Sequence, residues 1–239
     1  MLEVSELHAH YGRAHILQGV TLSAAKGEVL ALLGRNGAGK STTMKTIMGL
    51  VRPSAGQVRF EGAELAGREP FEIARAGIGY VPEERRIFTE LTVAENLEVG
   101  RRPGPPSGGW TAERIYALFP SLAAMRARPG GLMSGGEQQM LTIGRSLMGN
   151  PRLILLDEPS EGLAPVIIER MADAILALKR DGMTVLLSEQ NLHFVRLVSD
   201  RACVLEKGEI RWQGSMAALM AAEDVRANYP TIQRMPDSR

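Results

Sequence analysis

"EVLALLGRNGAGKST", residues 28–42, decides the fold of this chain. Its first part, "VLALL", has the length and composition of a buried strand, and "KST" opens a helical pattern that ends at Gly49 and Pro53. Between strand and helix stands the spacing G-x-x-x-x-G-K-S, which in this context indicates a phosphate-binding loop, or P-loop. A chance glycine turn is the alternative, and the strand and helix on either side argue against it.

The residues of this loop have distinct expected roles toward a nucleotide. The glycines let backbone N–H groups curl around the β-phosphate, and the helix N-terminus adds partial positive charge. Lys40 would neutralise β- and γ-phosphate oxygens, and the Ser41 hydroxyl would ligate Mg²⁺. We predict that the nucleotide is bound by Gly34, Arg35, Asn36, Gly37, Ala38, Gly39, Lys40, Ser41 and Thr42.

Strand-like and helical segments alternate downstream of the P-loop. The runs "GIGYVP" (77–82), "LILLD" (153–157) and "MTVLLS" (183–188) predict further buried strands. The alternation predicts an α/β fold with a mostly parallel sheet and helices on both faces. We expect residues 86–150 to form an inserted helical subdomain, in which "RRPGPPSGGW" (101–110) is an exposed connection.

Composition narrows the class of protein. The chain has 239 residues and a net charge of +1, so we expect one domain over residues 1–239 and no nucleic-acid partner. No apolar run is long enough to cross a bilayer, and the opening segment lacks the features of a signal peptide. The single cysteine, Cys203, predicts a reducing compartment and a small buried side chain.

"LILLDEP" (153–159) predicts the second half of the nucleotide site. A strand that ends in Asp157 would bring a carboxylate beside the P-loop, where it could hold Mg²⁺ directly or through water. Glu158, the next residue, could orient or deprotonate the attacking water. An apolar strand followed by Asp-Glu is common by itself, and the P-loop upstream is what favours the catalytic interpretation.

A second candidate anion-binding element lies much farther along the chain, in "MSGGEQQM" (133–140). Glycines after a hydroxyl residue allow backbone N–H groups to approach an anion closely. The element resembles the signature of ABC-type ATPases, usually Leu-Ser-Gly-Gly-Gln, and the resemblance covers nearly the whole chain. It implies a P-loop NTPase core of the ABC type, with an N-terminal antiparallel β subdomain and the inserted helical subdomain. The signature residues would be Ser134, Gly135, Gly136 and Glu137.

The resemblance also implies how the sites are shared between chains. In the family, the signature caps the γ-phosphate of ATP bound to a second subunit, which implies a dimer with a second ABC ATPase, identical or not. Tyr11 stands where the family keeps an aromatic residue that stacks on adenine. "SEGLAP" (160–165) would meet the opposite subunit, and Ala164 stands where many relatives have Asp.

Three positions depart from the common family pattern. Glu83 replaces a Gln that links Mg²⁺ and water to the transmembrane partner, and we expect it to be a third Mg²⁺ ligand beside Ser41 and Asp157. Glu137 replaces the last residue of the signature. Gln190 replaces the switch histidine that contacts the γ-phosphate and is our candidate catalytic residue at that position, whereas we expect His193 to lie on a helix leading away. The site is therefore either degenerate or a branch-specific variant. We favour the variant, because the remaining residues expected to bind phosphate or metal or to act in catalysis are intact: Lys40, Ser41, Asp157 and Glu158.

The full combination of motifs resembles the shorter of the two ATPase subunits of branched-chain amino acid importers. That resemblance implies an ATPase that uses ATP and Mg²⁺ at the cytoplasmic face of the membrane, with separate permease subunits and, indirectly, a periplasmic or extracellular binding protein. We expect residues 84–100 to form the groove for the permease. An ATPase of urea or amide uptake, an exporter ATPase and a soluble ABC ATPase are the alternatives.

Other residues have plainer interpretations. The spacing of the four histidines, at 8, 10, 15 and 193, does not support a metal site, although His8 and His10 share a strand face. Arg85 and Arg86 form either a solvated turn or a contact for acidic residues of a partner.

Overall fold

The computed structural model describes residues 1–104 and 108–222, which fold around two β-sheets. In the larger sheet, in the order β10-β9-β3-β8-β7-β6, every neighbouring pair is parallel except that β10 runs antiparallel along the edge. Its strands are β3 (Val29–Leu33), β6 (Ile78–Val81), β7 (Leu153–Asp157), β8 (Thr184–Glu189), β9 (Arg201–Glu206) and β10 (Glu209–Ser215).

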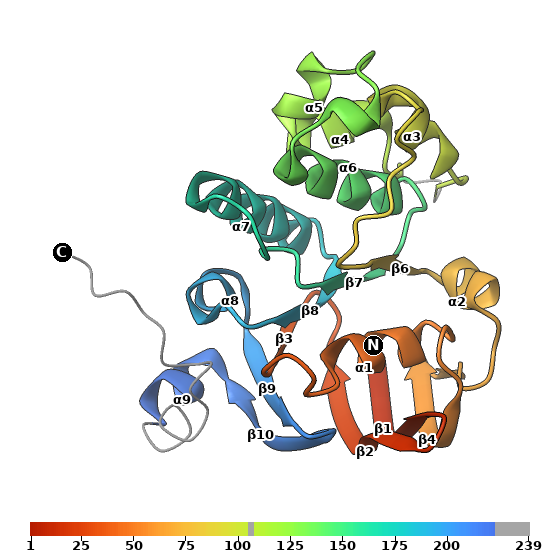
Figure 1. Ribbon diagram of the computed structural model, residues 1–239, viewed down its shortest axis with the longest axis vertical. Helices are drawn as coiled ribbons and strands as arrows, with labels where there is room; N and C mark the ends of the chain where they lie inside the picture. Colours follow the sequence, from red (N-terminus) through yellow and green to blue (C-terminus); the bar gives the residue numbers. More distant parts are fainter. Residues whose placement is uncertain (105–107, 223–239) are drawn as a thin grey trace.

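The smaller sheet is antiparallel and belongs to the N-terminal part of the chain. Its order is β2-β1-β4-β5, and it lies beside the first helix, α1 (Figure 1). Its strands are β1 (Leu2–Tyr11), β2 (Ala14–Ala24), β4 (Pro53–Phe60) and β5 (Ala63–Glu64).

Helices cover the parallel sheet and build a separate layer at one end of the molecule (Figure 1). That end layer contains α3 (Val93–Val99), α4 (Ala112–Leu118), α5 (Pro120–Ala124) and α6 (Gly135–Leu147), together with a short 3₁₀ helix at Gly130–Leu132. The other helices are α1 (Lys40–Ile47), α2 (Pro70–Ala76), α7 (Pro165–Arg180), α8 (Leu192–Val198) and α9 (Met216–Ala221). Among the described residues, no helix has both the length and the apolar composition that crossing a bilayer requires.

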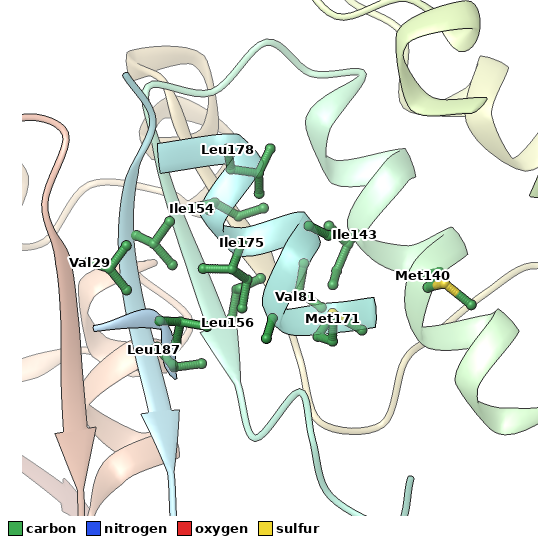
Figure 2. Packing of buried hydrophobic residues seen from close by; sticks show 14 of the residues in the cluster. Val29, Val81, Met140, Ile143, Ile154, Leu156, Met171, Ile175, Leu178 and Leu187 are labelled. Carbon is green, nitrogen blue, oxygen red and sulfur yellow. The ribbon is translucent and has the colours of Figure 1, made fainter. Parts of the chain in front are cut away.

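Each face of the parallel sheet is buried in its own hydrophobic core. Because strand residues alternate between faces, Val29 joins one core and Leu30 the other. On the first face, α7 packs between the strands and α6 (Figure 2), and its buried Ile175 and Leu178 belong to this core. The second face is covered by α1 and by the antiparallel sheet. Strands buried on both faces explain the continuous apolar runs in the sequence.

The predicted α/β fold is confirmed, including the mostly parallel sheet and the antiparallel N-terminal sheet. The helices of the end layer lie within residues 86–150, where the insert was expected. In the expected connection, residues 101–104 and 108–110 have no regular structure, and residues 105–107 lie outside the described residues. Residues 223–239 of the expected single domain also lie outside the described residues. Cys203 is fully buried, as predicted.

Candidate functional site

The carboxyl ends of three parallel strands meet at one edge of the larger sheet. The P-loop follows β3, Asp157 ends β7, and Glu189 ends β8. The strand register brings these ends level, since Leu33 lies opposite Glu189 and Asp157 lies opposite Ser188. Open α/β sheets bind ligands outside this edge, so the segments predicted from sequence to form one site come together here.

The glycines of the P-loop are required by its backbone path. Gly37 and Gly39 have φ angles of 79° and 111°, in the left-handed region that other residues adopt at a cost. Gly34 passes so close to β9 that a Cβ would lie 2.5 Å from the carbonyl oxygen of Leu205. The loop is therefore held against the sheet with its backbone exposed to a ligand.

Lys40 begins α1 and lies buried at the centre of the site, with 3% of its surface exposed. Its Nζ donates hydrogen bonds to the carbonyl oxygens of Gly34 at 2.8 Å and Arg35 at 3.1 Å. The same Nζ forms an ion pair with Glu158 Oε1 at 2.9 Å. The lysine thus joins the P-loop to the end of β7, where a phosphate oxygen would compete for its charge.

Asp157 is almost completely buried and accepts hydrogen bonds from three hydroxyl groups. Ser41 Oγ donates to Oδ1 at 3.0 Å, and Ser188 Oγ donates to the same oxygen at 2.6 Å. Tyr80 Oη donates to Oδ2 at 3.1 Å. Burial, together with the contact with Asp157, raises the pKa of the Tyr80 phenol well above its usual range, so this hydroxyl stays protonated and donates to the carboxylate.

The oxygen atoms around Asp157 fit a magnesium ion chemically. Mg²⁺ prefers hard oxygen ligands and is usually held by one or two carboxylates together with phosphate oxygens and water. The Ser41 hydroxyl and the Asp157 carboxylate, 3.0 Å apart, supply such a pair beside the P-loop. Glu83, the third predicted ligand, is exposed, and its pKa is raised by partial burial and by the negative charges of Glu158 and Asp157.

Glu158 is 7% exposed and has both carboxylate oxygens engaged. Oε1 pairs with Lys40, and Oε2 accepts a hydrogen bond from Gln190 Nε2 at 2.9 Å. Burial alone would raise the pKa of Glu158, but hydrogen bonds from Glu161, Lys40 and Gln190 lower it on balance. The hydrogen bond between Glu158 and Glu161, together with burial and neighbouring negative charges, raises the pKa of Glu161 to about 7.

Gln190, rather than His193, lies in the site. Besides Glu158, its Nε2 contacts Asn36 Oδ1 of the P-loop at 2.6 Å. His193 is an exposed residue of α8, the helix that was expected to lead away from the site. The amide of Gln190 therefore bridges the P-loop and the end of β7, and its catalytic role stays a prediction.

Tyr11 ends β1 at the turn into β2 and is 50% exposed. The hairpin that carries it runs along the P-loop, because a Cβ at Gly39 would lie 3.0 Å from Leu17 of β2. The turn after β9 joins the same region, since the Gly208 N–H donates to the Ala38 carbonyl at 2.9 Å. A ring at this place is free to stack on a flat ligand, and that role stays a prediction.

The predicted signature residues lie elsewhere in the chain, at the start of α6 in the end layer (Figure 1). Ser134 is exposed and caps the helix: its Oγ accepts from the Glu137 N–H, and the Ser134 N–H donates to Glu137 Oε2 at 2.7 Å. Such a reciprocal capping box uses Glu or Gln at this position. In the part of the chain that the structure describes, no hydrogen bond or ion pair joins the predicted signature residues to the P-loop.

Comparison with known proteins identifies the family of this chain. The sequence model of the ABC transporter family matches residues 17–161. The chain belongs to the ABC transporter family. It is an ABC ATPase and binds ATP or ADP. A solved structure of an ATP-binding cassette of an ABC transporter in its ADP conformation agrees with this. That cassette is 29% identical in sequence, with a TM-score of 0.81, and the match covers 96% of this chain and 98% of that one.

Two curated relatives of this ABC ATPase match over nearly their whole lengths. A high-affinity branched-chain amino acid transport ATP-binding protein of Pseudomonas aeruginosa is 43% identical over 96% of this chain and 99% of that protein. A lipopolysaccharide export system ATP-binding protein of Acidithiobacillus ferridurans is 33% identical over 96% of each. One relative named for amino acid transport and one named for lipopolysaccharide export thus both match this ABC ATPase over nearly their whole lengths.

Four residues of this ABC ATPase site were missed by the sequence analysis. Tyr80 and Ser188 hold Asp157, and Glu161 contacts Glu158. Glu189 is buried and accepts from the Ser160 N–H at 2.9 Å, which fixes the loop after β7. Ser188 and Glu189 could have been suspected, because polar residues at the end of an apolar strand lie at the ligand-binding edge. Tyr80 gave no such signal.

Proposed function

We propose that this ABC ATPase powers the uptake of branched-chain amino acids through a separate membrane permease. The supporting observation is the 43% identity, over nearly the full length of both chains, to a branched-chain amino acid transport ATP-binding protein. On this proposal the chain is a peripheral protein of the cytoplasmic membrane face, and a periplasmic or extracellular binding protein delivers the cargo. The nucleotide site itself contacts no cargo, so the substrate rests on this similarity.

The first step of the proposed cycle is nucleotide binding at the P-loop. The triphosphate lies over the backbone N–H groups of 34–39, with adenine stacked on Tyr11. Lys40 then exchanges its contact with Glu158 Oε1 for phosphate oxygens, since both compete for one ammonium group. Ser41 and Asp157 would hold Mg²⁺, with Glu83 as a further ligand, and the ion would offset the negative charge of the phosphates.

The release of Glu158 from Lys40 prepares it for hydrolysis. The freed Oε1 accepts the proton of the attacking water, while Gln190 still holds Oε2 and fixes the plane of the carboxylate. Asn36 holds Gln190 in turn, at 2.6 Å. Catalysis then rests on positioning and on electrostatic stabilisation, as is general for phosphoryl transfer.

The composite site requires a second subunit, either another copy or a related ATPase. The capped N-terminus of α6 carries Ser134 to Glu137, and within residues 1–104 and 108–222 no hydrogen bond or ion pair joins these residues to the P-loop. We infer that these residues cap the γ-phosphate of ATP in the second subunit, and that 160–165 contacts that subunit.

Cellular uptake tests the proposed cargo. Deletion of the gene should abolish transport of radiolabelled leucine, isoleucine and valine, and the intact gene should restore it. Lys40→Ala and Glu158→Gln should both fail to restore it: the first because ATP is not bound, the second because an amide cannot accept the proton. Normal leucine uptake with loss of urea or amide uptake, or of an export process, would instead identify one of the alternatives.

Crosslinking tests the proposed permease contact. Cysteine pairs between residues 84–100 and a cytoplasmic loop of the permease should crosslink in membranes, and the extent of crosslinking should change with ATP. A matched cysteine at Ala218 on α9 serves as the control, because it lies in another part of the chain. Crosslinks at the control position alone would contradict the docking surface, and function without any permease would favour a soluble ATPase.

A further inference from the structure

Two consecutive arginines after β6 have a strained backbone. Arg85 and Arg86 have φ angles of 60° and 49°, in the left-handed region that residues with a Cβ rarely adopt. Side chains of α6 hold both carbonyl groups in place. Thr142 Oγ1 donates to the Arg85 oxygen at 2.8 Å, and Arg145 Nη2 donates to the Arg86 oxygen at 2.6 Å. The direction of each arginine side chain is therefore set by the helix that also carries the signature.

The two side chains have different surroundings. The Arg85 guanidinium packs on the signature, where a Cβ at Gly135 would lie 2.6 Å from Nη1. Within residues 1–104 and 108–222, this half-buried guanidinium has no hydrogen-bond or ion-pair partner. The Arg86 side chain is 66% exposed and contacts Glu84 at 3.7 Å. Arg85 thus presents five N–H donors beside the signature, and Arg86 does not.

The negative charge of Glu137 at the start of α6 suggests a role for the Arg85 guanidinium in binding an anion. Glu137 brings a carboxylate into the first turn of the helix, where a neutral Gln would cap equally well. That negative charge opposes the approach of a phosphate. A guanidinium at Gly135 offsets it, and its planar fork matches two phosphate oxygens.

We propose that Arg85 binds the terminal phosphate of an ATP molecule held by the P-loop of a second copy of this chain, together with Ser134. The proposal rests on the proposed composite site and adds a residue to it. A contact of Arg85 with an acidic residue of the permease is the competing interpretation, and the experiments below separate the two.

The first experiment measures ATP-driven pairing of the purified chain by analytical ultracentrifugation, without permease. All chains carry Glu158→Gln, so that bound ATP is not consumed. Arg85→Ala should raise the ATP concentration for half-maximal pairing at least about tenfold, which corresponds to about 1.4 kcal/mol. Arg86→Ala is the matched control, since alanine likewise keeps a Cβ at a left-handed position, but the side chain that it removes contacts Glu84 rather than the signature, and it should pair normally. ATP binding to the monomer should be the same for both.

The second experiment asks which chain's nucleotide Arg85 contacts. In the split pair, a Lys40→Ala chain meets an Arg85→Ala chain, so the one bound ATP faces an intact Arg85 across the interface. In the double pair, a chain carrying both substitutions meets a chain carrying neither, so the one bound ATP faces a chain without Arg85. The pairs contain the same substitutions, and the split pair should form at least about tenfold more readily.

Each outcome bears on the proposal. Equal formation of the two mixed pairs, or preference for the double pair, contradicts a contact across the interface. Normal pairing of Arg85→Ala combined with loss of permease-stimulated ATPase activity favours the permease contact instead. Failure of the Glu158→Gln chain to pair at all overturns a contact with a second copy. Unchanged ATP binding by Lys40→Ala would be a different result, because it would contradict the proposed nucleotide site itself.

Discussion

Gln190 is the residue whose substitution tests the site most directly. Its Nε2 donates to the Glu158 carboxylate at 2.9 Å and to Asn36 Oδ1 at 2.6 Å. A hydrogen bond to a charged group contributes about 1.5–3 kcal/mol, and a neutral one about 0.5–1.5 kcal/mol. Alanine at 190 removes both and leaves the carboxylate free to rotate about its remaining contacts.

The expected loss of rate follows from the charged contact. If the hydrogen bond from Gln190 to Glu158 stabilises the transition state by about 1.4–2.7 kcal/mol, its loss lowers kcat about ten- to a hundredfold. The affinity for ATP should change little, because Lys40 and the P-loop backbone remain. His193→Ala is the matched control: His193 lies two residues into α8, is exposed, and should support nearly normal turnover.

The assay is steady-state phosphate release by the purified variants in complex with the permease, at saturating Mg-ATP. Thermal midpoints measured alongside would separate a folding defect from a catalytic one. A larger loss with His193→Ala than with Gln190→Ala would refute the assignment of the switch position. Equal activity of Gln190→Ala and the unmodified protein would show that Glu158 is oriented by other contacts.

Three further predictions concern binding, pH and burial. Tyr11→Ala should weaken ATP binding by about 1–3 kcal/mol, by analogy with base stacking, and spare turnover at saturating ATP. A fluorescence titration measures the dissociation constant, and the control Tyr11→Phe should bind ATP normally. An unchanged dissociation constant for Tyr11→Ala would leave Tyr11 a packing residue. Glu161→Gln should raise the thermal midpoint more at pH 8 than at pH 5. The folded pKa of about 7 lies above the unfolded value of 4.5, so this carboxyl loses stabilising free energy as pH rises between them; equal shifts at both pH values would contradict it. Cys203, fully buried and with its pKa raised to about 11 by burial, should resist thiol reagents at pH 8 until the chain is unfolded in denaturant, and rapid labelling of the folded protein would be the opposite result.

The framework of the site could be predicted because its signals are local. A buried strand, a glycine loop and a helix start are adjacent in 28–42, so the P-loop needs no knowledge of distant contacts. The partners of Asp157 are different. They depend on the order β8-β7-β6, which puts Ser188 on one side of β7 and Tyr80 on the other. One sequence does not specify which strands become neighbours, so these hydroxyl groups were not predicted.

The left-handed backbone after β6 is a second feature that local sequence hides. Arginine has no preference for positive φ, and the sequence around Arg85 and Arg86 therefore suggested only a solvated turn or a contact for acidic residues of a partner. The conformation is stabilised by α6, through Thr142 and Arg145, more than fifty residues farther along the chain. Without that contact the orientation of Arg85 toward Gly135 is not accessible to pattern reasoning.

The three departures from the family pattern acquire physical explanations once their contacts are known. Glu137 keeps the capping box of α6, because the cap needs an oxygen acceptor that Glu and Gln both have. Gln190 supplies an N–H donor to Glu158 without a charge that changes near neutral pH. Partial burial and the negative charges of Glu158 and Asp157 raise the pKa of Glu83. A site losing its function would be expected to lose such contacts first, since nothing would maintain them. Their presence favours a branch-specific variant over a degenerate site, and the Gln190 assay is the measurement that decides between the two.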